Sequence, residues 1–339
     1  MTSMKAMILG CAGLTLQPWE VDFFAENQPW GFILFGRNIA GAEQLKRLTA
    51  ELRASVGRDA PIFIDQEGGR VQRIKPPLAP RYPAAALFGA LYARNEESGI
   101  RATWLLGRLH AFDLAPYGID ANCLPVLDVG IDGANDVIGD RAFAKNVNPV
   151  AILGKALAEG LMAGGVLPTM KHMPGHGRAT ADSHLHLPHV ATTLDDLRQR
   201  DFVPFKALRD LPAAMTAHIV FEAIDPAAPA TVSPKVISEI IRGEIGFDGL
   251  LMSDDVSMKA LSGDFGGRAK NIIAAGCDLV LHCNGDRDEM IAVAENCGVL
   301  AGRGLERAEC ALAVRRRKDD ADEQTLRAEF EALMGTAVA

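Results

Sequence analysis

Short apolar runs alternate along the chain with longer segments that have helical periodicity. Eight of these runs are candidate β-strands, at 6–9, 31–35, 62–65, 121–127, 166–171, 214–218, 250–254 and 279–283. The helical patterns between them include 42–56, 149–163, 233–244 and 268–275. Regular alternation of strand and helix is typical of βαβ units that build a parallel sheet. Eight such units predict an α/β fold in which the sheet closes into a single (β/α)8 TIM barrel.

The barrel is expected to form one domain over residues 1–339. The Pro/Ala-rich stretch 76–86 is short enough to be a long βα loop rather than a linker. An open, doubly wound sheet is the alternative, but the GxGxxG turn typical of that fold is absent after the first strand. Ser233 and Pro234 predict a helix start, with serine as the N-cap and proline at the first helical position. The tail 304–339 predicts one or two extra C-terminal helices packed outside the barrel.

Charge and cysteine content narrow the choice of partner and compartment. The net charge of −8 argues against nucleic acid, because an acidic protein gains nothing by neutralising phosphates. The basic tract 315–318 is followed at once by acidic residues, which predicts a solvated helix face. No apolar run reaches the roughly 18 residues of a membrane span, so we expect no membrane partner. Six cysteines without metal spacing and an amino terminus without a signal-peptide pattern predict a cytoplasmic protein, which we expect to be a monomer.

Polar residues interrupt several of the predicted strands at their carboxyl ends. The residues that do so are Asp65, Asp128, Lys171, His172, His218, Ser253, Asp254 and Asp255. The carboxyl ends of barrel strands all meet at one face, where the chemistry of such barrels takes place. Charged groups are costly in a core unless they are paired or functional. Their convergence therefore predicts a pocket for a polar, neutral ligand.

Five of the eight histidines lie in residues 171–189, which makes a metal site one interpretation. His172 and His176 are four residues apart, as in helical zinc motifs, but a Pro-Gly pair between them argues against a helix. His184 and His186 form an HxH pair in a loop after the fifth strand, whereas metal-dependent barrel hydrolases carry theirs on an early strand. We therefore predict no metal ligands in this segment.

Acid–base chemistry is the second interpretation of the same segment. Asp182 precedes His184 by two residues, which is close enough for the carboxylate to orient and charge the imidazole. A histidine with a pKa near neutrality can donate a proton and later accept one. An Asp-x-His pair on its own also occurs as an ordinary surface hydrogen bond.

Taken together, these segments resemble glycoside hydrolase family 3, and most closely its NagZ-type β-N-acetylglucosaminidases. The likeness lies in the pattern KHxPGHGxxxxDSHxxxP, which runs here from Lys171 to Pro188. It extends to 31–38, 65–73, 126–129, 138–143, 215–218 and 253–258, and continues from 276 to 284. The matches occur in order along the chain and fall on the predicted strand ends, which makes the resemblance specific.

The resemblance implies a retaining glycosidase with no metal and no organic cofactor. It assigns the nucleophile to Asp254, although strand parity leaves Asp255 as an alternative. It assigns the general acid/base to His184, with Asp182 as its partner. The residues that it assigns to binding of the terminal N-acetylglucosamine are Asp65, Arg73, Arg141, Lys171 and His172. These five could instead form a salt-bridge network that only lines the barrel mouth.

The implied substrate is a small saccharide or muropeptide with a terminal β-linked N-acetylglucosamine. GlcNAc-1,6-anhydroMurNAc from peptidoglycan recycling is the expected source. The alternatives are a β-glucosidase or xylosidase of the same family, a metal-dependent barrel amidohydrolase, and a catalytically inactive sugar-binding protein. If His184 were not the acid/base, His218 and Glu67 would be the first candidates to replace it.

Overall fold

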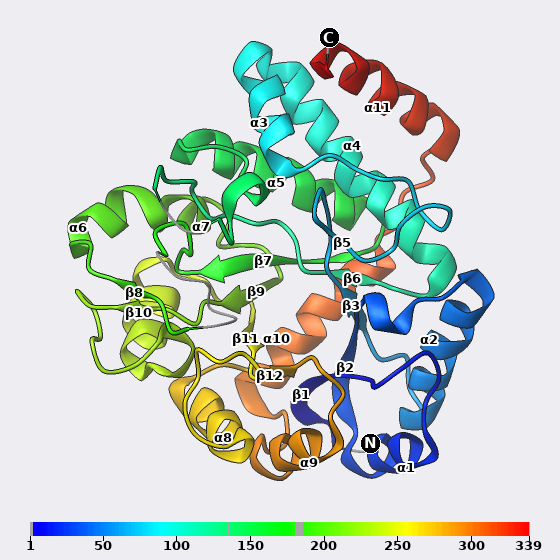
Figure 1. Ribbon diagram of the computed structural model, residues 1–339, viewed down its shortest axis with the longest axis vertical. Coiled ribbons are helices and arrows are strands. Elements are labelled where there is room, and N and C mark those ends of the chain that lie inside the picture. Colours follow the sequence, from blue (N-terminus) through cyan, green and yellow to red (C-terminus); the bar gives the residue numbers. More distant parts are fainter. Residues whose placement is uncertain (1–2, 134–135, 180–185, 339) are drawn as a thin grey trace.

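The computed structural model describes residues 3–133, 136–179 and 186–338, and their parallel strands close into a barrel surrounded by helices (Figure 1). In order around the barrel these strands are β1 (Lys5–Gly10), β12 (Leu279–His282), β11 (Leu250–Asp255), β9 (Ala213–Thr216), β7 (Leu167–Met173), β6 (Ala121–Asn122), β3 (Ile62–Ile64) and β2 (Pro29–Leu34). Each coincides with one of the eight predicted strands. The (β/α)8 TIM barrel expected from the sequence is therefore confirmed.

The barrel strands are mostly apolar because both of their faces are buried, and the charged residues of β7 and β11 lie toward the carboxyl ends of those strands. On β1, Ala6 and Ile8 belong to a buried cluster that takes side chains from every barrel strand. Met7 and Leu9, which alternate with them, belong to the larger cluster that includes the surrounding helices. A strand with one face in the barrel interior and the other under a helix has no need of alternating polar positions.

Helices cover the outside of the barrel, and their bounds agree with the predicted patterns where these were specified. They are α1 (Pro18–Asn27), α2 (Ala42–Val56), α3 (Ala85–Arg94), α4 (Glu96–Leu114), α5 (Val147–Ala163), α6 (Leu194–Asp196), α7 (Val203–Ala207), α8 (Phe265–Ala275), α9 (Arg287–Asn296), α10 (Gly302–Leu312) and α11 (Glu323–Val338), with π-helical segments η4 (Leu197–Asp201) and η6 (Val236–Glu244). Pro234 and Lys235 are already helical and lead into η6, and the backbone N–H of Val236 donates to Ser233 Oγ over 3.1 Å, so the predicted N-cap is confirmed.

The C-terminal helices occupy two different places. Helix α11 packs on the outside of the barrel against α4 (Figure 1). Helix α10 instead contacts β11, and its Ala308 and Ala311 belong to the barrel's interior cluster. The tail thus supplies one outer helix, as predicted, and one that packs onto the barrel core.

Two segments differ from the sequence-based expectations near the fourth and third strands. Strand β6 ends at Asn122, well short of the predicted residue 127. Pro125 has no N–H to donate to a hydrogen-bond ladder with the neighbouring strand. Beyond β6, an isolated β-bridge joins Val126 to Lys171. After β3 the chain forms an antiparallel hairpin that was not predicted, made of β4 (Gln66–Gly68) and β5 (Val71–Gln72).

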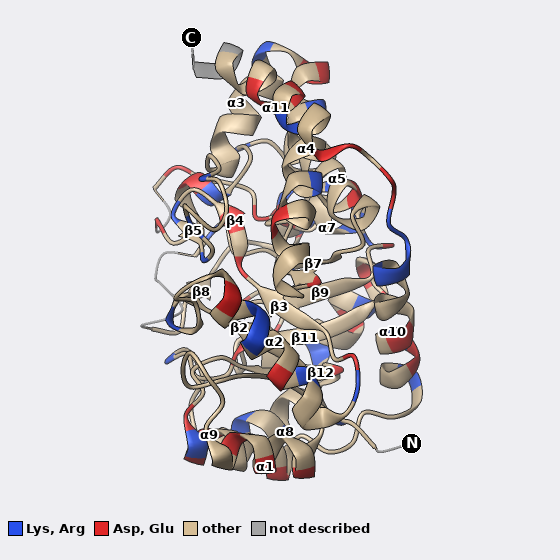
Figure 2. Ribbon diagram, turned by 90° about the vertical axis from the view of Figure 1, so that its right-hand side faces the viewer, with Lys and Arg blue, Asp and Glu red and all other residues tan. Residues whose placement is uncertain are grey.

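The basic tract 315–318 was predicted to be a solvated helix face. For Arg315 this prediction is wrong. Its side chain is only 13% exposed and its guanidinium pairs with Asp59 and, over 2.7 Å, with Asp120. The carboxylate of Asp120 is largely buried and needs a cation, which explains why Arg315 turns inward. Figure 2 shows basic residues and the acidic residues that follow them in the connection between α10 and α11. Among the described residues, no helix combines the length and apolarity needed to cross a membrane.

Candidate active site

A cavity of about 490 Å³ lies at the carboxyl ends of the barrel strands. It is lined by all the predicted site residues that the structure describes, namely Asp65, Arg73, Arg141, Lys171, His172 and Asp254. Apolar side chains such as Ile33, Phe35 and Leu281 form other parts of its wall. Asp182 and His184 lie outside the described residues. Four of the six predicted residues in this cavity were selected as polar strand ends, and Arg73 and Arg141 were named only by the resemblance.

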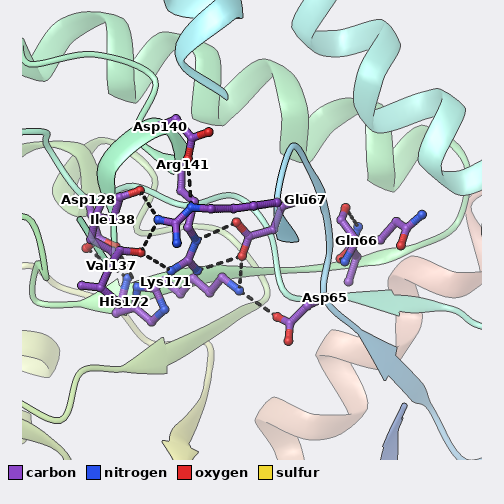
Figure 3. Close-up of polar contacts among 12 residues, drawn as sticks. Asp65, Gln66, Glu67, Asp128, Val137, Ile138, Asp140, Arg141, Lys171 and His172 are labelled. Carbon is purple, nitrogen blue, oxygen red and sulfur yellow. Dashed lines mark hydrogen bonds and ion pairs between the residues drawn. The ribbon is translucent and has the colours of Figure 1, made fainter. Parts of the chain in front are cut away.

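Ion pairs tie the cationic side chains of this cavity together (Figure 3). Lys171 Nζ lies 2.8 Å from Asp65 Oδ1 and 2.7 Å from Glu67 Oε1. Arg73 contacts the other oxygen of Asp65 over 3.0 Å. Arg141 binds Glu67 through two nitrogens, at 2.8 and 2.9 Å. The result is a continuous network of two carboxylates and three cations.

Asp65, Glu67 and Lys171 stay charged in this network although they are largely buried. Burial would raise the pKa of Asp65, but the charges of Lys171 and Arg73 outweigh that effect and hold it well below its usual range. Burial opposes ionisation of Glu67 in the same way, yet Arg141 and Lys171 lower its pKa to about 2. Although burial disfavours the Lys171 ammonium, the two carboxylates raise its pKa. Fixed charges of this kind give strong hydrogen bonds to a neutral polar ligand.

His172 is oriented by a carboxylate behind it. Its Nδ1 lies 2.7 Å from Asp128 Oδ2, while Asp128 Oδ1 accepts the backbone N–H of His176 over 2.6 Å. Burial would raise the pKa of Asp128, but the His172 ring and these hydrogen bonds lower it to about 2. With Nδ1 engaged, Nε2 is the ring nitrogen that His172 can offer to a ligand in the cavity.

The two adjacent aspartates at the end of β11 have different surroundings. The carboxylate of Asp255 accepts hydrogen bonds from the Ser257 N–H at 3.0 Å, the Ser257 hydroxyl at 2.5 Å and the Cys283 N–H at 3.2 Å. Its oxygens are thus used to hold the loop after β11 and the end of β12. Asp254 also lines the cavity, and its Oδ1 accepts the Asp255 N–H over 2.8 Å.

Neither of the replacement proton donors considered from the sequence has a suitable environment. His218 contacts Thr231 Oγ1 at 2.8 Å through Nδ1 and the Asp255 carbonyl at 3.0 Å through Nε2, and burial lowers its pKa. Glu67, with a pKa of about 2, carries no proton to donate near neutrality. Within 3–133, 136–179 and 186–338, no three His, Cys, Asp or Glu side chains are grouped as metal ligands.

The sequence did not predict how Glu67 and Asp128 contribute to the site. Glu67 stands in the Asp65–Arg73 motif and was considered only as a substitute acid, whereas it anchors both Arg141 and Lys171. Asp128 was recognised as a polar strand end, but the sequence did not indicate that it contacts His172. The signal in each case was an acidic residue in a segment that the apolar pattern places inside the protein.

Comparisons with known proteins agree with this geometry. The Glycosyl hydrolase family 3 N terminal domain matches residues 16–316. A β-hexosaminidase of Alkalilimnicola ehrlichii is 39% identical over 282 residues, which is 82% of this chain and 80% of that protein. The chain therefore belongs to glycosyl hydrolase family 3, and it is a glycoside hydrolase of the β-hexosaminidase group in that family.

Solved structures of NagZ from Neisseria gonorrhoeae are similar over almost the whole chain. One, in complex with N-trifluoroacetyl-D-glucosamine, superposes with a TM-score of 0.85 at 32% identity and covers 99% of this chain and 97% of that one. Another, in complex with a zinc ion, superposes with a TM-score of 0.83 at 31% identity, with the same coverage of both chains.

Proposed function

We propose that the protein is a retaining exo-β-N-acetylglucosaminidase that releases terminal β-linked N-acetylglucosamine. Its proposed substrate is the GlcNAc-1,6-anhydroMurNAc unit of muropeptides, in the course of peptidoglycan recycling. The observation that carries the proposal is the single cavity in which Asp254 lies beside the network of Asp65, Arg73, Arg141 and Lys171. The glucosamine derivative bound to the related NagZ supports a sugar of this size and type.

Asp254 is the proposed nucleophile. Its carboxylate attacks the anomeric carbon, the glycosidic C–O bond breaks, and a covalent glycosyl-enzyme forms through an oxocarbenium-like transition state. Asp255 is less suited to this role because three hydrogen-bond donors already hold its carboxylate. The proposed nucleophile is thus Asp254, which the resemblance selects and which lines the cavity.

His184 is the proposed general acid/base and Asp182 its orienting partner. In the first step the imidazolium gives a proton to the departing oxygen. In the second step the neutral imidazole takes a proton from water, which attacks the anomeric carbon and releases the sugar from Asp254. The surroundings of His218 and Glu67 support this choice, since both side chains are committed to other contacts.

The charged residues of the cavity are proposed to bind the sugar. Lys171, Arg141 and Arg73 each present N–H groups in fixed positions, and Asp65 and His172 Nε2 can complete hydrogen bonds to hydroxyls. Charge-assisted hydrogen bonds are roughly twice as strong as neutral ones, so a network of fixed charges can hold a neutral ligand tightly.

Release of nitrophenol from two aryl glycosides tests the activity. The purified protein should hydrolyse 4-nitrophenyl β-N-acetylglucosaminide far faster than the matching β-glucoside, and it should release N-acetylglucosamine from a GlcNAc-1,6-anhydroMurNAc peptide. A preference for the β-glucoside or β-xyloside would favour the other members of the family. The same assay after exhaustive dialysis against EDTA should give unchanged rates, and activity that needs added zinc would support a metal-dependent hydrolase instead.

We further propose that the protein works in the cytoplasm as a monomer. All six cysteines of the sequence are free thiols in the described structure, and five of them are buried, which suits a reducing compartment. Cell fractionation and light scattering on the purified protein test these two points. Recovery with secreted proteins, or a dimer at assay concentration, would contradict them.

A further inference from the structure

Arg141 is carried into the cavity by a loop of which the structure describes residues 130–133 and 136–145. Its two ends are joined by a backbone hydrogen bond, in which the Gly130 N–H donates to the Ala144 carbonyl over 3.0 Å. Arg141 lies near the returning end of this loop and reaches Glu67 on the β4–β5 hairpin. The position of its guanidinium in the cavity therefore depends on how the loop is held.

Arg200 holds the loop at its base from a different part of the chain. It lies on η4, and its Nη2 donates to the Gly130 carbonyl at 2.9 Å and to the Lys145 carbonyl at 2.7 Å. One nitrogen thus contacts both ends of the loop. Arg200 lies outside the sugar cavity, against a separate hollow that it lines together with Asn146 and Arg178.

Arg70 holds the same loop near its tip. It lies in the turn of the β4–β5 hairpin, and its Nη2 contacts the carbonyls of Asp136 at 2.5 Å and Val137 at 2.8 Å. Its Nε contacts the Asp140 carboxylate over 3.1 Å. Figure 3 shows Arg141 of this loop directed toward Glu67, with Val137 and Asp140 on the same loop. Arg141 therefore lies between the anchor at Arg70 and the anchor at Arg200, four residues before the Lys145 carbonyl that Arg200 holds.

We propose that Arg200 is a positioning residue for sugar binding, which acts through Arg141 without touching the substrate. This inference rests on the proposed role of Arg141 in binding the sugar. Loss of the Arg200 side chain would remove the contacts to the Gly130 and Lys145 carbonyls, leave the backbone hydrogen bond between Gly130 and Ala144 to hold the base alone, and give the Arg141 guanidinium more freedom relative to Lys171 and Asp65. A displacement of about 1 Å in a binding group can cost on the order of 100-fold in rate, so a remote anchor of this kind has a measurable effect.

Steady-state kinetics of Arg200→Met on an aryl β-N-acetylglucosaminide tests the proposal. We expect kcat/KM to fall by about tenfold, mainly through a higher KM, because a contact made equally in the ground and transition states affects KM alone. Arg200→Lys keeps one N–H donor near the carbonyls and should fall between wild type and Arg200→Met. A change in kcat with KM unaffected would overturn the proposal.

Arg198→Met is the matched control on the same helix. Arg198 is 44% exposed, and it pairs with Asp195 and Glu244 on the outer surface instead of with the loop. We expect its kinetics to equal those of wild type. A rise in KM as large as that of Arg200→Met would mean that any change in η4 disturbs the site, and the specific role of Arg200 would be lost.

A double-mutant cycle with Arg141→Ala distinguishes positioning from general loss of structure. If Arg200 acts through Arg141, Arg200→Met should change KM by less than about twofold once Arg141 is already alanine. Full additivity of the two effects would overturn the inference while leaving the proposed function intact. If Arg141→Ala alone has no effect on KM, the proposed role of Arg141 fails, and the inference fails with it. Arg200→Lys serves in the same cycle if Arg200→Met does not fold.

Discussion

At the scale of single residues, Glu67 contacts two cations of the cavity at once, Arg141 and Lys171. All three side chains are largely buried, with exposed fractions of 6%, 11% and 3%. Removing the charge of Glu67 leaves the buried Arg141 without its carboxylate and Lys171 with Asp65 alone. Breaking a buried ion pair at one partner is strongly destabilising. Glu67 is therefore as important to the folded state as to the site.

Replacement of Glu67 by glutamine should lower the free energy of unfolding at pH 7 by about 3–5 kcal/mol, as is usual when one partner of a buried ion pair is removed. The folded-state pKa of Glu67, about 2, lies below its ordinary value of 4.5. Its contribution is therefore complete above pH 4.5 and is lost as the pH falls towards 2. The difference between wild type and variant, measured by urea denaturation, should shrink over that interval.

Glu43→Gln provides the control for this measurement. Glu43 pairs with Lys46 on the surface of α2, where the two side chains are 76% and 45% exposed. Exposed pairs contribute between zero and about 1 kcal/mol, so this variant should stay close to wild type. A loss at Glu67 no larger than that at Glu43, or one that does not change with pH, would contradict the account of the network.

Asp254 and His184 should respond differently to the leaving group of the substrate. Asp254→Ala should lose nearly all turnover on every substrate, because it removes the proposed nucleophile. His184→Ala should cost about 10²–10⁴-fold on unactivated sugars, the usual range for general acid/base catalysis. An aryl leaving group needs little protonation, so its first step should be spared and deglycosylation should become slow.

Pre-steady-state kinetics with added azide separates these two roles. His184→Ala should show a burst of nitrophenol and should form a β-glycosyl azide, with turnover rescued. Asp182→Ala should behave in the same way but more weakly, since it removes only the orienting group. Equal slowing on activated and unactivated substrates, without burst or rescue, would show that His184 is not the acid/base.

The sequence was informative about which residues meet, and less so about how they are paired. Strand-end logic placed Asp65, Lys171 and Asp254 on one face because a closed barrel has a single carboxyl end. It could not show that Glu67 joins Arg141 to Lys171, because those contacts cross between strands far apart in sequence. The choice of Asp254 and His184 came from the family resemblance, and it remains a prediction.

At the scale of elements, the apolar runs predicted every barrel strand, since buried parallel strands are apolar on both faces. The β4–β5 hairpin was not predicted, because residues 66–72 contain no apolar run that would indicate a strand. Its turn is made by Gly68 and Gly69, which have φ values of 103° and 55°, and such conformations favour glycine. The hairpin nevertheless carries Glu67 and Arg70, so a short element without a pattern positions a large part of the site.

The start of η6 provides a test of local stability away from the cavity. Ser233 Oγ accepts the Val236 N–H at 3.1 Å and donates to Asp225 at 2.5 Å. Ser233→Ala should lower the free energy of unfolding by about 1–2 kcal/mol, the upper part of the range for an N-cap, with kinetics unchanged. Ser238→Ala is the control on the same helix, since Ser238 is exposed and bonds only the Pro234 carbonyl. Equal stability of the two variants in thermal melts would contradict the N-cap assignment.

At the scale of the whole molecule, the barrel presents different structures at its two ends. Side chains at the carboxyl end form the cavity, and α10 packs onto the interior cluster with Ala308 and Ala311. Separation of a stabilising end from a catalytic end is general in barrels of this kind. Helix α11, which packs against α4, belongs to neither end. The sequence predicted such outer helices, but the apolar pattern alone could not say which strands or helices they would contact.

The attachment of α11 should contribute to stability and leave catalysis unaffected. Arg327 contacts Asp113 over 2.5 Å and the Tyr82 hydroxyl over 3.1 Å, and the Asp113 side chain is only 5% exposed. Arg327→Met leaves that carboxylate without its cation, and because Arg327 itself is 27% exposed we expect a loss of about 2 kcal/mol, below the range for fully buried pairs.

Arg101→Met is the matched change at the same helix interface. Arg101 binds Glu329 through two nitrogens at 2.7 Å, yet these side chains are 42% and 38% exposed. Water can replace this pair, so its loss should cost less than about 1 kcal/mol. Both variants should keep wild-type kcat and KM per folded molecule, since neither arginine lines the cavity. If Arg101→Met were more destabilising than Arg327→Met in urea denaturation, burial of the partner carboxylate would not determine how much an ion pair at this interface contributes. If Arg327→Met changed KM, α11 would belong to the active site.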